Sequence, residues 1–153
     1  MTRALAGTGS PLRIRLQARL SDLPRVRAAV FRFARGEGVS ALQANRIMAA
    51  VDEACSNAVR HGHGGTVGQL EVRLERIGSR LRIVVRDHGP GFQLPVEKVH
   101  PDWGGYVKAR RAGGLGLHFL RRVMDSVTYG PSAAGGNELV LVKRVRPTRR
   151  KTV

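Results

Sequence analysis

The chain has 153 residues, of which 42% are hydrophobic and 25% are charged, as is usual for one soluble globular domain. No apolar run approaches the roughly 20 residues of a membrane-spanning helix. The start of the chain lacks a signal-peptide pattern, so we expect a cytoplasmic protein outside the membrane. The only cysteine, Cys55, excludes an internal disulfide. The net charge of +16 indicates an anionic partner, but the basic residues are scattered, so nucleic acid is not the expected one.

One strand and two helices are predicted in the first part of the chain. Residues 12–19 alternate apolar and charged side chains, which predicts a strand. Apolar residues at helical spacing then predict a helix that ends near Gly36. Ser40 with Gln43 has the form of a capping box. The apolar stripe behind this pair predicts the longest helix, at about residues 40–61.

Strand patterns dominate the rest of the chain, which also contains one long loop. Residues 92–112 lack apolar periodicity, and a loop of that length in a compact domain is usually functional or mobile. The other predicted elements are strands at 69–77 and 80–86, a helix at 115–125, and strands at 126–130 and 137–145.

This order of elements predicts an α/β (α+β) two-layer sandwich. Its sheet is expected to be mixed and mostly antiparallel, with the helices on one face. We expect a single domain at residues 12–145, preceded by a flexible N-terminus at 1–11. A basic disordered tail is expected at 146–153, because that segment is rich in arginine and poor in apolar residues.

A first cluster of candidate site residues lies on the longest predicted helix. Glu53 and Asn57 are four residues apart, so they share one side of that helix. A carboxylate beside an amide oxygen can position a hydroxyl or a water next to Mg²⁺, which prefers oxygen ligands. Arg60 can meet phosphate oxygens. The alternative is a solvated helix face, on which such pairs are common.

Two glycine-containing motifs supply further candidates. Asp87 follows a strand and precedes Gly89 and Gly91; its carboxylate can accept a hydrogen bond from an exocyclic amine, while the glycines let the backbone approach a base. In isolation this motif is also that of a turn. The segment GGLGL, residues 113–117, opens a helix whose first amide groups suit a phosphate, although short glycine-rich helix starts are common.

The three motifs, taken in this order, resemble the GHKL-type (Bergerat) ATP-binding fold and, within it, the bacterial anti-sigma-factor serine kinases of the stress-response and sporulation type. EACSNAVRHG is similar to the N-box of that family, DHGPGF to its Asp-x-Gly-x-Gly box, and GGLGLHFLRRVMDSV to its second glycine box and the following helix. The resemblance extends from about residue 12 to 145. Asn137 stands where relatives usually carry a threonine, and we expect its side chain still to form a hydrogen bond.

The resemblance implies a role for each candidate residue. Glu53 is the implied general base, Asn57 the implied Mg²⁺ ligand, and Asp87 the implied reader of the adenine amine of ATP. Gly89 and Gly91 would lie beside the base. The other residues implied to bind the nucleotide, with the glycines beside its phosphates, are Arg60, Gly113, Gly114, Leu115, Gly116 and Leu117. The loop at 92–112 corresponds to the family's ATP lid.

The implied function is that of an ATP-dependent protein serine kinase that is also an anti-sigma factor. Such a domain binds either a sigma factor or an unphosphorylated anti-sigma-factor antagonist, and phosphorylation of a serine releases the antagonist. A homodimer is expected. Two alternatives are a binding module that holds ATP without using it and a basic nucleic-acid-binding protein. The catalytic fragment of a sensor histidine kinase is disfavoured, because no phosphoacceptor helix pair precedes the first predicted strand.

Overall fold

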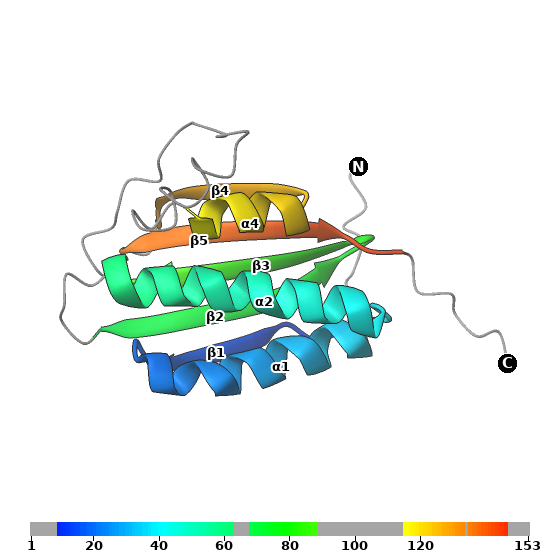
Figure 1. Cartoon of the computed structure of the whole chain (residues 1–153), viewed down its shortest axis with the longest axis horizontal. Helices are drawn as coiled ribbons and strands as arrows, with labels where there is room; N and C mark the ends of the chain where they lie inside the picture. The colour runs from blue at the N-terminus through cyan, green and yellow to red at the C-terminus, as the bar shows by residue number, and fades with distance from the viewer. Residues whose placement is uncertain (1–8, 63–67, 89–114, 134, 147–153) are drawn as a thin grey trace, which may run out of the picture.

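A computed structural model describes residues 9–62, 68–88, 115–133 and 135–146, and Figure 1 shows their arrangement. The helices and strands predicted within these ranges are all present, with ends shifted by a few residues; the predicted lid at 92–112 lies outside the described residues. No helix in these ranges is both long and apolar enough to cross a bilayer. The elements are β1 (Leu12–Gln17), a 3₁₀ helix (Leu20–Asp22), α1 (Leu23–Gly36), α2 (Ala41–Asn57), a π turn (Ala58–Gly62), β2 (Gln69–Ile77), β3 (Arg80–Asp87), α4 (Leu115–Val123), β4 (Ser126–Pro131) and β5 (Asn137–Arg144).

The strands form one five-stranded sheet in the order β1-β2-β3-β5-β4. The sequence predicts a mixed, mostly antiparallel sheet, and each of the four pairings among the described strands is antiparallel. β2 and β3 are joined by a tight turn, in which Gly78 has φ 60°. β5 pairs with β3 on one side and β4 on the other, so the last of the described strands lies inside the sheet.

The helices α1, α2 and α4 cover one face of this sheet (Figure 1), which confirms the predicted two-layer sandwich. Because side chains alternate between the faces of a strand, every second strand residue packs beneath the helices. Burying one such aliphatic side chain contributes about 1.5–3 kcal/mol. The core includes Leu70, Val72, Leu74, Leu81, Ile83, Val85, Leu139 and Leu141 from the strands, and Ala44, Ile47, Val51, Ala54 and Cys55 from α2.

The opposite face of the sheet is polar and is crossed by arginine–glutamate pairs. The pairs are Arg13–Glu71, Arg15–Glu71, Arg73–Glu75 and Arg82–Glu75. Since these side chains remain partly exposed, each pair contributes only about 0–1 kcal/mol. They link β1, β2 and β3 side by side. The alternation of charged and apolar residues in the sequence therefore marks which face of each strand meets water.

The buried side chain of Arg76 connects three segments of the chain near the C-terminal end of α1. The side chain of Arg76 on β2 is on the helix-facing side of the sheet, and the residue is only 4% exposed. Its guanidinium donates to the carbonyl oxygens of Glu37, Gly78 and Arg146, and the Glu37 carboxylate lies 3.6 Å away. Arg76 thus joins the end of α1, the β2–β3 turn and the segment after β5 through one fork of donors.

Cys55 is completely buried on the core-facing side of α2, and burial raises the pKa of its thiol. A raised pKa lowers the fraction of reactive thiolate at any given pH, and burial blocks access as well. We therefore expect the native chain to react with Ellman's reagent at pH 8 far more slowly than the urea-unfolded chain. Absorbance of the released dye measures both rates. Equal rates in the two states would show that Cys55 is accessible and contradict this placement.

Candidate functional site

The helix α2 carries the first cluster of predicted site residues. It begins at its predicted cap, where Ser40 Oγ accepts a hydrogen bond from the Gln43 backbone amide at 3.2 Å. At its other end the regular α-helix stops at Asn57 and continues as the π turn Ala58–Gly62. A π turn widens the helix by one residue per turn and is frequent at functional sites.

Glu53 and Asn57 lie on successive turns at this end of α2. Asn57 is only 9% exposed, whereas Glu53 is half-buried. A solvated face, the alternative interpretation of the pair, is therefore wrong for Asn57, because the whole last turn of α2 packs into the domain. Arg60 lies on the π turn and is exposed. The cluster thus combines a sheltered amide, a carboxylate that water can reach and an exposed guanidinium.

Asp87 is the last residue of β3 and is only 2% exposed. Its partner in the sheet register is Asn137, the first residue of β5. The Asn137 side-chain amide donates a hydrogen bond to Asp87 Oδ1 at 3.3 Å, which confirms that this asparagine retains a hydrogen-bonding role. Burial and a side-chain donor fix the orientation of the Asp87 carboxylate. A simple surface turn would require neither.

Gly136, just before β5, packs against the backbone of Asp87, a contact that the sequence motifs do not predict. Gly136 has φ 72°, and a Cβ at this position would overlap the carbonyl oxygen of Asp87. The Gly-Gly pair in the sequence indicates a turn with positive φ, but only the packing reveals that the second glycine makes room for the Asp87 backbone. The absence of a side chain at Gly136 therefore allows Asp87, a candidate site residue, to take its position.

These residues gather at one end of the domain. The end of α2, the end of β3 and the starts of β5 and α4 lie along the same edge in Figure 1, at the left of that view. Leu115, Gly116 and Leu117 form the first turn of α4, and their binding of phosphate stays a prediction. Gly89, Gly91, Gly113 and Gly114 lie outside the described residues.

The donors present at this end suit magnesium and an adenine nucleotide. Asn57 and Glu53 offer amide and carboxylate oxygens, the ligand type that Mg²⁺ prefers, and Mg²⁺ is commonly held by few protein groups with several waters. The described ranges contain no group of three His, Cys, Asp or Glu side chains that would form a denser metal site. The buried Asp87 carboxylate is an acceptor for an amine, and the exposed Arg60 can donate to phosphate.

A two-layer sandwich with a buried aspartate at the end of its central strand and an asparagine at the end of its central helix has the GHKL-type architecture. Residues 16–143 match the family model described as the histidine kinase-like ATPase domain. The chain belongs to this family. Membership fixes the fold, whereas the site residues, the reaction and the partners are proposals.

Curated relatives resemble about half of the chain. The chain is 38% identical over 86 residues to the serine-protein kinase RsbW of Bacillus pumilus, an alignment that covers 51% of this chain and 52% of the relative. It is 35% identical over 86 residues to the serine-protein kinase RsbW of Staphylococcus epidermidis, covering 52% and 53%. The aligned segment therefore spans about half the length of each of these kinases.

Solved structures share the fold over a greater part of the chain. The structure of the RsbU and RsbW domains of a Mycobacterium tuberculosis protein matches with a TM-score of 0.61 and 22% identity, covering 91% of this chain and 33% of that one. The histidine kinase domain of a blue-light activated kinase of Erythrobacter litoralis matches with a TM-score of 0.52 and 20% identity, covering 82% and 60%. At these identities the likeness concerns the fold alone.

Proposed function

We propose that this protein is an ATP-dependent protein serine kinase that acts as an anti-sigma factor. The observation that carries the proposal is the pair of sheltered polar side chains, Asn57 and Asp87, at the same end of the domain as the half-exposed Glu53. A kinase site needs a metal ligand, a nucleotide reader and a base that the substrate hydroxyl can reach. The named activity of the RsbW relatives supports the same proposal.

Each residue has a proposed task. Asp87 accepts a hydrogen bond from the adenine amine, Asn57 is a ligand of Mg²⁺, and Arg60 together with the first turn of α4 and the glycines before it holds the phosphates. Bound Mg²⁺ would neutralise charge on the phosphate oxygens. Glu53 accepts the proton of the attacking serine hydroxyl. The half-burial of Glu53 suits this task, because a protein substrate must reach it.

The proposed partners are a sigma factor and an antagonist protein that carries the substrate serine. The domain would bind one or the other, and phosphorylation of the antagonist would end its binding. We also propose a homodimer and a cytoplasmic location. Sedimentation equilibrium of the purified chain tests the homodimer: a mass of one chain at micromolar concentration would contradict it.

Isothermal calorimetry with ATP and Mg²⁺, followed by transfer of labelled γ-phosphate to candidate antagonists from the same organism, tests the proposed function. We expect micromolar binding of ATP and label on a serine. Binding without transfer to any candidate would leave only a nucleotide-gated binding module. A folded chain that gives no heat with ATP would contradict the whole assignment. Affinity for DNA or RNA that falls steeply with salt and ignores ATP would favour a nucleic-acid binder.

Asp87→Asn is expected to weaken ATP binding by about 1–3 kcal/mol, the usual contribution of a charge-assisted hydrogen bond. The replacement is suitable because asparagine keeps an oxygen that can accept the hydrogen bond from Asn137, so the sheet register is preserved. Calorimetry with ATP and with GTP measures the effect. The loss should be specific to ATP, and an equal loss for both nucleotides would show that Asp87 does not contact the base.

A further inference from the structure

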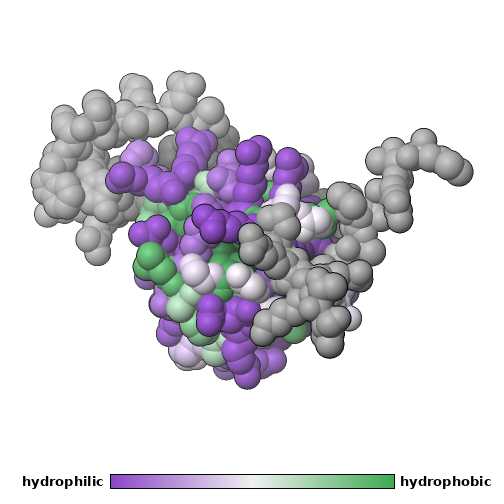
Figure 2. All heavy atoms as spheres, turned by 90° about the vertical axis from the view of Figure 1, so that its right-hand side faces the viewer, coloured by the Kyte–Doolittle hydropathy of each residue, from purple (hydrophilic) through white to green (hydrophobic). Residues whose placement is uncertain are grey.

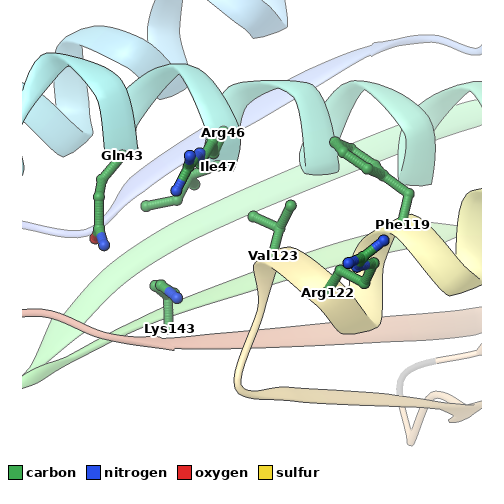
Figure 3. A pocket seen from close by; sticks show the side chains of 7 residues that line it. All are labelled: Gln43, Arg46, Ile47, Phe119, Arg122, Val123 and Lys143. Carbon is green, nitrogen blue, oxygen red and sulfur yellow. The ribbon is translucent and has the colours of Figure 1, made fainter.

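A basic groove lies between α2 and α4, at the opposite end of these helices from Asn57 and Asp87. It has a volume of about 420 Å³ and is lined by residues of the first half of α2, the second half of α4 and the end of β5. Figure 3 shows that these side chains come from α2, from α4 and from the neighbouring strand β5. None of them belongs to the candidate nucleotide site, so the groove is separate from the ATP-binding part of the function proposed above.

Three cations surround the groove, and no carboxylate is found among the described residues that line it. Arg46 comes from α2, Arg122 from α4 and Lys143 from β5. Within the described ranges, none of the three takes part in a salt bridge or a side-chain hydrogen bond. The nearby Asp125 instead accepts a hydrogen bond from the Arg144 backbone amide at 2.6 Å. Three like charges around one hollow repel one another, and an anionic partner would relieve that repulsion.

Apolar side chains accompany the cations. Phe119, which is 39% exposed, and the partly exposed Val123 form the accessible apolar part of the lining, while Ile47 behind them is buried in the core. Leu42, one helical turn before Arg46, is 62% exposed. Figure 2, which looks at this end of the molecule, shows hydrophilic residues gathered around smaller hydrophobic areas. Exposed aromatic and aliphatic side chains mixed with arginines are typical of protein interfaces, whereas a free phosphate would leave the apolar surface uncovered.

We propose that this groove binds an acidic segment of a partner protein, with a large apolar side chain of the segment against Phe119 and Val123 and its carboxylates on Arg46, Arg122 and Lys143. The volume lies in the range of about 300–1,000 Å³ that binding pockets have, so the groove admits at least one such side chain. The planar guanidinium groups of the two arginines match carboxylates through paired hydrogen bonds. The helices α2 and α4 form the two walls of a groove in which a helical or extended segment can lie.

The test selects short random peptides displayed on phage against the immobilised full chain, without nucleotide, and then measures labelled winners by fluorescence anisotropy. We expect the winners to combine Asp or Glu with Leu, Ile or Phe. Arg122→Glu should lower the affinity for these peptides by about tenfold or more, since a charge like that of the peptide replaces a complementary one. Phe119→Ser should weaken them as well. Both residues are partly or fully exposed, so neither replacement endangers the core.

Arg121→Glu is the matched control, because Arg121 neighbours Arg122, is exposed on the same helix and does not line the groove. We expect it to change the affinity by less than about twofold. Equal effects of the two charge reversals, winners without acidic residues, or no winners at all would overturn the proposal. Complete displacement by inorganic phosphate would also overturn it, in favour of a small-anion site. ATP calorimetry on the same proteins separates this outcome from failure of the kinase proposal.

Discussion

Glu53→Ala is expected to bind ATP and Mg²⁺ normally and yet to transfer phosphate to serine at least ~10²-fold more slowly, the usual scale for removal of a general base. The expectation depends on the position of Glu53, which is half-buried one turn before the buried Asn57. It can reach a substrate hydroxyl without being part of the packed end of α2. Single-turnover transfer of labelled phosphate measures the chemical step, and calorimetry measures the binding of ATP.

Asp52→Ala is the matched control for this variant. Asp52 is the neighbouring carboxylate on α2, but it pairs with Arg27 of α1 at 2.8 Å and has no proposed role in the reaction. Loss of this partly exposed pair should cost about 0–1 kcal/mol of stability and leave transfer unchanged. Asn57→Ala should have a different effect from Glu53→Ala. It removes the proposed metal ligand, so it should abolish the metal-dependent binding of ATP. If Glu53→Ala transferred phosphate at the original rate, the kinase proposal would fail and only the nucleotide-gated binding module would remain.

Gly136→Ala is expected to lower the free energy of unfolding by about 2–4 kcal/mol and to weaken ATP binding as well. Two costs add: a residue with a side chain is strained at φ 72°, by roughly 1–2 kcal/mol, and its Cβ overlaps the Asp87 carbonyl oxygen, so backbone has to move. The displaced backbone is that of the proposed adenine reader. Urea denaturation and calorimetry with ATP measure the two effects.

Gly135→Ala separates strain from overlap. Gly135 also has a positive φ, 90°, but an added Cβ there would meet no atom within 4 Å. The free energy of unfolding of this variant should fall only by the cost of backbone strain, roughly 1–2 kcal/mol. Its affinity for ATP should be unchanged. If the two alanine variants lost the same stability and bound ATP equally, the contact between Gly136 and Asp87 would have no energetic importance.

Local patterns in the sequence were sufficient to predict most elements of the fold. The capping pair Ser40 and Gln43 marked the start of α2, and strict alternation marked β2 and β3 because one face of these strands is buried and the other is wet. Such signals arise between residues a few positions apart. They specify an element wherever one of its sides must be buried.

The support of the candidate site could not be predicted in the same way. The burial of Asn57 depends on the packing of the last turn of α2 into the domain, and its position in the sequence is equally compatible with a solvated face. The contact of Gly136 with Asp87 joins residues about 50 positions apart through the β3–β5 register, which no local pattern encodes. Motif order supplied the candidates, and the sheet brings two of them, Asp87 and Asn137, into contact.

The position of β5 has a consequence for synthesis of the chain. Of the strands that the structure describes, β5 is the last to be made, yet it lies between β3 and β4. Until β5 leaves the ribosome, one edge of β3 is unpaired, and an unpaired edge invites association with other chains. During the same interval Asp87 lacks both the hydrogen bond from the Asn137 side chain and the packing of Gly136 against its backbone. A nascent chain therefore cannot assemble this end of the domain early, and the proposed nucleotide site is completed together with the last strand.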